Sequence, residues 1–336
     1  MDERGSVGAV AILVVSILCS CALGALAYVG WTIDYGRRVE SARVLRLSLR
    51  SAAREVLDEL ARDATPESDG PRDSVWSRLG PRADGLSLVL ADASSRLNPN
   101  FVSPELLEKT DLRSLLAPGS SPGSLAAYRA EKGLSADPLH YAGIFADSSL
   151  PSLSGFGWAN LNIDDRDSLH SLYLSLCGDE DGAEAFSLRL DAARAAKRRI
   201  GSGELKSFLG GAYRLAYPTI SAEAPYNVNF ASPELIRQVL SYPGFGIVDP
   251  RARAEAILAA RAERDLGPID ISALCGTVTS GPVLDHLGAR TWFWTLEAEG
   301  RGRRLVLTVA VWPEAESRAQ EGKAKRLSIV ETRFEP

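Results

Sequence analysis

Residues 6–33 read SVGAVAILVVSILCSCALGALAYVGWTI, a run of 28 residues without a charged side chain. As a helix this run is roughly 40 Å long, which exceeds the roughly 30 Å hydrocarbon core of a bilayer. It begins almost at the first residue, whereas the apolar part of a removable secretory signal is only about 7–15 residues long. We therefore predict a single-pass transmembrane helix at residues 6–33, with the rest of the chain outside the bilayer.

The remaining chain has the composition of a globular protein. Of the 336 residues 24% are charged and 45% are hydrophobic, which excludes a disordered chain. About 300 residues follow the apolar run, enough for one large domain or two small ones. The net charge of −5 argues against nonspecific nucleic-acid binding, which requires a basic excess.

The apolar run is predicted to continue as one helix to about Asp63. Apolar residues recur at helical spacing through residues 42–60, and arginines occupy much of the other face. The first proline is Pro66, so no residue before it breaks the helix, and the segment 65–73 has the composition of the loop that ends it. The apolar face of this part of the helix includes Leu45, Leu49, Val56 and Leu60.

The C-terminal part is predicted to form an antiparallel sheet. Residues 291–299 and 303–312 are rich in aromatic and β-branched residues and flank Gly300-Arg301-Gly302, which is typical of a β-hairpin. Residues 325–334 and 86–91 are further candidate strands. The predicted fold class is α+β: a long N-terminal helix packed on a small antiparallel sheet, with a large, mainly α-helical insertion.

The insertion contains a repeated pattern. Residues 98–107 read NPNFVSPELL, residues 227–236 read NVNFASPELI, and residues 160–169 read NLNIDDRDSL. Each copy predicts a turn followed by a helix, with N-caps at Ser103, Asp165 and Ser232. Because asparagine side chains commonly close turns on their own backbone, we assign a structural role to Asn98, Asn100, Asn160, Asn162, Asn227 and Asn229.

A helix-hairpin-helix pattern follows the third copy. Residues 242–247 read YPGFGI, and residues 252–264 have the pattern of a helix. The pattern resembles units that bind the DNA backbone in competence-type, membrane-anchored DNA receptors, and such a receptor is the alternative function. However, residues 238–250 contain no lysine or arginine, and phosphate binding requires positive charge. Packing between helices is therefore the preferred interpretation.

Candidate catalytic and metal-binding residues are few. The segment Gly119–Gly123 matches the Gly-x-Ser-x-Gly nucleophile elbow, but no strand precedes Ser121, so we predict a loop. The acidic segment Asp179–Glu184 lacks the ligand spacing of a calcium loop and is explained by an N-cap and a first helical turn. The histidines have no metal-binding spacing; they are His140, His170 and His286. We predict no enzymatic activity and no cofactor, with calcium left open.

The cysteines leave two alternatives. Cys19 and Cys21 lie in the apolar run, and only Cys177 and Cys275 follow it. Their separation matches no Cys-x-x-Cys metal site. An oxidising compartment would permit one disulfide between Cys177 and Cys275; otherwise they are two separate buried thiols, since free cysteine packs as a small hydrophobe.

The order of these features resembles the general secretion pathway protein K family, the large minor pseudopilins of type II secretion. The resemblance rests on Arg4-Gly5 before the membrane helix, the Asn-x-Asn units and the terminal strands. It implies that a prepilin peptidase cuts between Gly5 and Ser6 and that the globular part is periplasmic. The arginines after the apolar run would instead place that part in the cytoplasm by the positive-inside rule. Most pilin-like proteins have glutamate as the fifth mature residue, where this chain has Val10 and the K family also lacks the acid. The resemblance therefore implies a position at the filament tip.

The resemblance also implies a domain plan and a set of partners. The expected divisions are a leader at 1–5, a transmembrane helix at 6–33, its periplasmic continuation at 34–63, a pilin-like sheet at 64–97 and 288–336, and an inserted α-helical domain at 98–287. The expected partners are other minor pseudopilins, inner-membrane secretion components and the prepilin peptidase, but no nucleic acid. The predicted contact face with other subunits includes Leu45, Leu49, Val56 and Leu60. The expected location is the inner membrane, crossed once.

Overall fold

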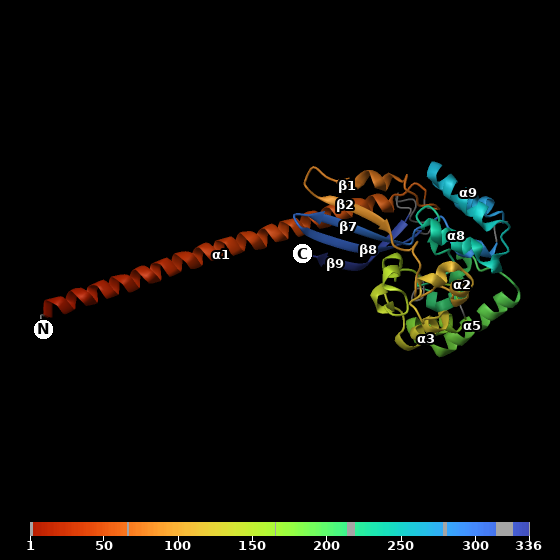
Figure 1. The fold of residues 1–336 in the computed structure, drawn as a ribbon, viewed down its shortest axis with the longest axis horizontal. Helices are drawn as coiled ribbons and strands as arrows, with labels where there is room; N and C mark the ends of the chain where they lie inside the picture. The colour runs from red at the N-terminus through yellow and green to blue at the C-terminus, as the bar shows by residue number, and fades with distance from the viewer. Residues whose placement is uncertain are drawn as a thin grey trace.

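The computed structural model describes residues 3–65, 67–164, 166–213, 219–277, 281–313 and 325–335. Its longest element is α1 (Glu3–Ala61), an unbroken helix that protrudes from the body as a rod (Figure 1). Side chains 12–41 are all exposed, and from residue 12 onward Leu45 is the first whose side chain is buried. The predicted long helix is confirmed, and it ends at Ala61, where Asp63 accepts a hydrogen bond from the amide of Thr65 and closes a turn.

A five-stranded antiparallel sheet packs on the second half of α1, in the strand order β1-β2-β7-β8-β9. The strands are β1 (Gly80–Pro81), β2 (Ser87–Asp92), β7 (Phe293–Gly300), β8 (Arg303–Pro313) and β9 (Lys325–Glu335). The β7–β8 hairpin turns at Arg301 and Gly302, which both have the positive φ that a two-residue hairpin of the favoured hand requires. The predicted strands and the α+β plan are confirmed.

The helix and the sheet share one apolar core. Alternate strand residues face α1, as the two-residue period of a strand requires. The strand side of this core includes Leu88, Leu90, Trp294, Leu296, Leu305 and Val309, and the helix side includes Leu45, Leu49, Ala52, Ala53, Val56 and Leu60. Gly300 lets the hairpin approach closely, because a Cβ there would lie 2.4 Å from Leu86 Cδ2.

A mainly helical insertion lies between β2 and β7, at the end of the rod (Figure 1). Its helices are α2 (Pro104–Lys109), α3 (Pro122–Lys132), α4 (Arg166–Cys177), α5 (Glu180–Ala195), α6 (Leu205–Leu209), α8 (Pro233–Ser241), α9 (Pro250–Glu263) and α10 (Pro268–Cys275). Short 3-10 helices are η1 (Ser74–Arg78, before β1), η2 (Asp111–Leu115), η3 (Pro138–Tyr141), η4 (Asp147–Ser152), η5 (Ser202–Glu204), η6 (Gly210–Ala212), η7 (Pro243–Phe245) and η8 (Pro282–Asp285).

The three sequence copies begin three units with a common plan. In each unit the residue before the first asparagine pairs in parallel with a residue far along the chain: Leu97 with Leu153, Ala159 with Ile220, and Tyr226 with Leu287. The last two pairings belong to β3 (Ala159–Asn160) with β4 (Ile220–Ser221), and β5 (Tyr226–Asn227) with β6 (Leu287–Gly288). The predicted N-caps Ser103 and Ser232 are confirmed, and Asp165 lies outside the described residues.

Candidate functional site

The exposed half of α1 has the length and composition of a membrane span. Its most apolar 18-residue window has a mean hydropathy of 2.4, and none of that window is buried within the chain. Large apolar side chains from Ile12 to Ile33 are exposed. Gly5 and Ser6 lie within α1, and cleavage between them stays a prediction.

The four residues predicted to contact other subunits lie inside the chain's own core. Leu45, Leu49, Val56 and Leu60 are between 0% and 8% exposed and pack against the sheet. The apolar stripe predicted to be a subunit interface is the stripe that the sheet covers, so this prediction is wrong. Helical spacing of apolar residues indicates that a face is covered, but it does not indicate which surface covers it.

Among the described residues, none covers a different face of α1, which we call its free face. Val44 and Leu47 are 51% and 56% exposed, and Leu47 lies about 200° around the helix from Leu45. Exposed arginines border this face. Two of them, Arg46 and Arg50, place their guanidinium groups 5.5 Å and 5.3 Å from the ring centroid of Phe334 on β9. Such cation–π contacts fix the last strand to the helix.

The first asparagine of each unit closes a turn on its own backbone. The Oδ1 atoms of Asn98, Asn160 and Asn227 accept hydrogen bonds from the amides of Asn100, Asn162 and Asn229, at 2.9, 2.8 and 2.9 Å. This bond two residues along the chain is an Asx turn, and it lets the strand bend directly into the helix that follows. The predicted structural role of the asparagines is confirmed.

The side chain of the second asparagine in each unit bonds to both the backbone N–H and the backbone C=O of one distant residue. Asn229 accepts from Leu266 N at 2.9 Å and donates to Leu266 O at 3.1 Å. Asn100 holds Ser135 and Asn162 holds Ile200 in the same way. A side-chain amide has one donor and one acceptor edge, so it satisfies both backbone groups of one residue.

An arginine in a later helix completes each unit, and sequence analysis missed it. The three residues are Arg129, Arg194 and Arg261, which donate to Pro99 O, Leu161 O and Val228 O, respectively 30, 33 and 33 residues earlier. Each also donates to the carbonyl three residues beyond that one. The near-constant spacing is a sequence signal for this interaction.

The third unit also bonds to the sheet through buried polar groups. Asn227 Nδ2 donates to Thr291 Oγ1 at 3.0 Å, and Thr291 Oγ1 donates to Asp92 Oδ2 at 2.8 Å. Asp92 accepts further bonds from Ser94 and Ser95, and its burial raises the pKa of the carboxyl group. These bonds join the end of β2 to the start of β7, so the insertion and the sheet are held as one body.

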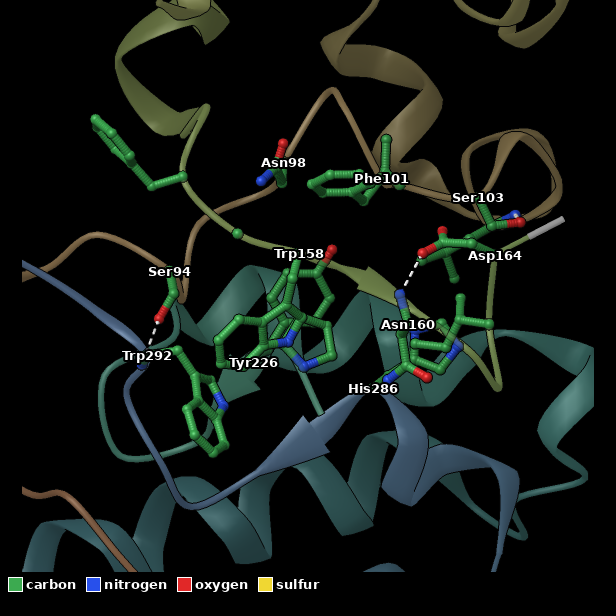
Figure 2. A pocket seen from close by; sticks show the side chains of 16 residues that line it. Ser94, Asn98, Phe101, Ser103, Trp158, Asn160, Asp164, Tyr226, His286 and Trp292 are labelled. Atoms are coloured by element: carbon green, nitrogen blue, oxygen red, sulfur yellow. Dashed lines mark hydrogen bonds between the residues drawn. The ribbon is translucent and has the colours of Figure 1, made fainter. Parts of the chain in front are cut away.

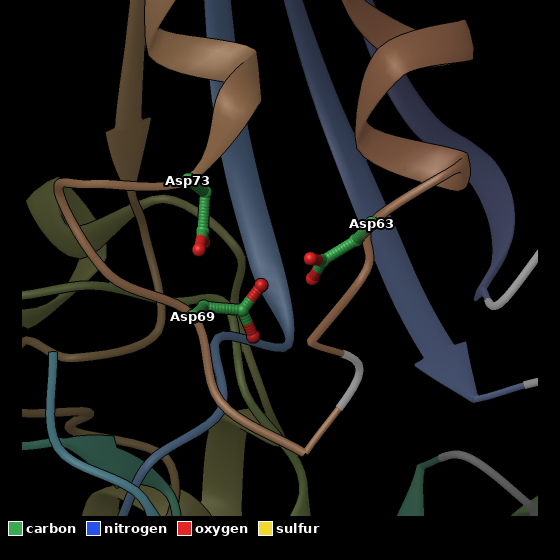
Figure 3. Close-up of side chains that lie close together, drawn as sticks. All are labelled: Asp63, Asp69 and Asp73. Carbon is green, nitrogen blue, oxygen red and sulfur yellow. The ribbon is translucent and has the colours of Figure 1, made fainter.

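Three carboxylates lie together in the loop after α1 (Figure 3). One oxygen each from Asp63, Asp69 and Asp73 lies within 4.8 Å of the others. Carboxylate oxygens are the ligands that calcium prefers. A backbone amide donates to each of them: Thr65 N to Asp63, Thr291 N to Asp69 and Gly70 N to Asp73, all at 2.8 to 2.9 Å. These bonds order the loop and connect it to Thr291, just before β7.

A small cavity lies where the three units meet (Figure 2). Its volume of about 20 Å³ admits one water molecule and no substrate. Asn98 Nδ2 and Trp158 Nε1 line it and have no hydrogen-bond partner among the described residues, whereas Asn160 Nδ2 donates to two carbonyl groups. His286 also lines it, and burial lowers its pKa to about 4, so this imidazole is neutral at pH 7.

The predicted helix-hairpin-helix is present as α8, η7 and α9. Two of the hairpin amides bond within it, Phe245 N to Tyr242 O and Gly246 N to Pro243 O. The ring of Phe245 packs on Tyr242 and on His286, with centroids 4.9 Å apart in each case. The hairpin therefore packs on the insertion, as expected, and these amides do not face outward for a phosphate.

The remaining candidates have structural partners. Ser121 is the N-cap of α3, with its hydroxyl accepting from Ser124 N, so the predicted loop is the start of a helix. Asp179 is the N-cap of α5, as expected. His140 and His170 each contact a serine hydroxyl.

The disulfide alternative is wrong, because both soluble cysteines are free thiols. Cys275 belongs to the core of the first and third units, and Cys177 packs against the separate core of the second unit. Burial raises the pKa of the Cys275 thiol to about 11, which makes it unreactive at neutral pH.

Comparisons with known proteins find a likeness among solved structures. No protein-family model matches the chain, and a search of curated proteins finds no match. Among solved structures, the chain is similar to a chain of the GspK-GspI-GspJ complex from the enterotoxigenic Escherichia coli type 2 secretion system. The match covers 89% of this chain and 99% of that chain, at 13% identity and a TM-score of 0.32. At those values it decides neither family nor function.

Proposed function

We propose that this chain is a non-enzymatic minor pseudopilin of a type II secretion system. In this proposal α1 anchors it in the inner membrane, and the body lies in the periplasm. The main support is α1 itself, one helix that is apolar and exposed from Ile12 to Ile33 and that packs one face of its second half against the chain's own sheet. The rod and the body are therefore rigidly joined, and the apolar half needs a cover from outside the chain: lipid before assembly and neighbouring helices after it.

The proposed place at the filament tip rests on Val10 and on the insertion. Counted from Ser6, Val10 is the fifth residue, so no carboxylate is available there to pair with the terminal amine of a further subunit. The insertion adds its helices at the end of the body away from the N-terminus (Figure 1). Both features favour a position at the tip of the filament over one in its interior.

The proposed partners are other minor pseudopilins, and the surface that fits them is the free face of α1. This face includes Val44 and Leu47, which the sheet leaves exposed. Because these side chains take no part in the chain's core, a charge there should weaken association without unfolding the body.

Processing and association test this function separately. The intact mass of the membrane-extracted protein should lack Met1–Gly5 when the cells contain a prepilin peptidase, and should retain them when they do not. Retention of the five residues in both strains would contradict the proposal. Leu47→Asp should reduce co-purification with the partner pseudopilins. Leu188→Asp is the matched control, because Leu188 is a 60% exposed leucine on α5, away from α1, and the substitution changes the charge by the same amount. Undiminished co-purification of Leu47→Asp would remove this face as the contact.

A further inference from the structure

The charge-free run of α1 is longer than a bilayer needs. Its 28 residues span about 42 Å as a helix, about 12 Å more than the hydrocarbon core. To fit the whole run inside that core, the helix would have to tilt by about 44°, beyond the usual range of about 0–40°. Roughly eight residues of the run therefore belong outside the hydrocarbon.

Aromatic side chains gather at the body-proximal end of this run. Tyr28, Trp31 and Tyr35 are 67%, 62% and 58% exposed, and steps of three and four residues place them on one face of α1. The ring centroids of Tyr28 and Trp31 are 6.3 Å apart, and those of Trp31 and Tyr35 are 5.6 Å apart and stacked. These side chains lie well before Leu45, the first buried residue, so the chain's own core does not use them.

We infer that Tyr28, Trp31 and Tyr35 form an aromatic anchor in the headgroup layer of the bilayer leaflet nearer the body. The inference rests on the proposed membrane function and adds where the bilayer ends. Tyrosine and tryptophan favour this layer because one end of the ring system is apolar and the other donates hydrogen bonds. This face of the helix is thus in contact with lipid headgroups.

The lengths agree with this placement. If the hydrocarbon ends at Ala27, the span is residues 6–27, which measure about 33 Å, or about 31 Å at the usual tilt of about 20°. That is close to the roughly 30 Å core, whereas the full run overshoots it. Charged side chains begin at the body-side end of this interface, where Asp34 and Arg37 are exposed and 4.0 Å apart.

The placement leaves a stalk of residues 36–44 between bilayer and body. All its side chains except Ala42 are exposed, and it includes the ion pair of Glu40 and Arg43. Nine helical residues span about 14 Å, so the body is held clear of the headgroups by about that distance. The free apolar face at Val44 begins at the end of this stalk, where a neighbouring helix has access to it.

Depth-dependent quenching of Trp31 tests the anchor. The full chain is reconstituted in phosphatidylcholine vesicles in which a lipid carries a nitroxide either near the headgroup or near the acyl-chain terminus. The other tryptophans all lie beyond residue 75, so the quenching lost on Trp31→Phe reports Trp31 alone. We expect the shallow nitroxide to quench Trp31 at least about twofold more than the deep one, as an interfacial ring requires.

The outcomes separate the inference from the function. Stronger quenching by the deep nitroxide would overturn the aromatic anchor and leave the membrane span intact. A lack of quenching by either lipid, in protein that still floats with the vesicles, would also overturn it, because protein would then cover the rings. Failure of the chain to float with vesicles would overturn the proposed membrane function itself.

Discussion

Replacing Leu49 by alanine tests the packing of α1 on the sheet. Leu49 has no exposed surface, and its core contains Leu88, Leu296 and Leu305 from three strands. Leucine-to-alanine changes at fully buried sites cost about 2.7–5 kcal/mol, from lost transfer free energy and the cavity that remains. We expect about 3–4 kcal/mol here, because neighbours on both the helix and the sheet limit collapse into the cavity.

The expected loss is measurable as a melting temperature. For domains of 150–250 residues, 1 kcal/mol lowers the melting temperature by about 2–4 °C, so Leu49→Ala should lower it by roughly 6–16 °C. The measurement is thermal unfolding of the full chain in detergent, followed by tryptophan fluorescence. Trp294 lies fully buried in the same core and therefore reports its loss.

Leu47→Ala is the matched control, because Leu47 is 56% exposed and outside the core. It should change stability by no more than about 0.5 kcal/mol. Two results would refute the packing: an unchanged melting temperature for Leu49→Ala, or an equal loss for both variants. Either would mean that α1 does not lie under the sheet in solution.

Three further predictions concern the insertion and its thiols. Asn229→Ala leaves the buried N–H and C=O of Leu266 unpaired and should cost about 3 kcal/mol of unfolding free energy, measured as a lower urea midpoint. Asn162→Ala should cost less, because Asn162 is partly exposed and water replaces its bonds; equal costs would contradict this reasoning. The folded-state pKa of His286 is lowered to about 4 against about 6.5 unfolded, so the unfolded chain takes up the proton first and stability falls as the pH drops through this window. Between pH 7 and pH 5 this accounts for about 2 kcal/mol, which His286→Asn should remove from the pH dependence of unfolding; identical slopes for both proteins would exclude this role. Because Cys177 and Cys275 are free thiols in separate cores, a reducing agent should leave the melting temperature and the intact mass unchanged, and a mass gain of two hydrogens on reduction would reveal a disulfide.

Much of the fold follows from interactions between near neighbours in the sequence. The long helix was predictable because its apolar spacing and the absence of proline act within each turn. The hairpin around Gly300–Gly302 was predictable for the same reason. The Asx turns of Asn98, Asn160 and Asn227 were also predictable, since their bonds reach only two residues along the chain.

The surfaces and long-range bonds were decided by tertiary structure. Asn100 and Asn229 accept hydrogen bonds from residues 35 and 37 positions away, and no local sequence pattern identifies those partners. The stripe with Leu49 was recognisable as apolar, but lipid, a second subunit or the chain's own sheet would all require the same spacing. Helical periodicity depends on residues within a turn or two, whereas burial depends on where strands from both ends of the chain come to lie. For that reason the sequence determined that this face of α1 must be covered, and only the folded chain decided that its own sheet covers it.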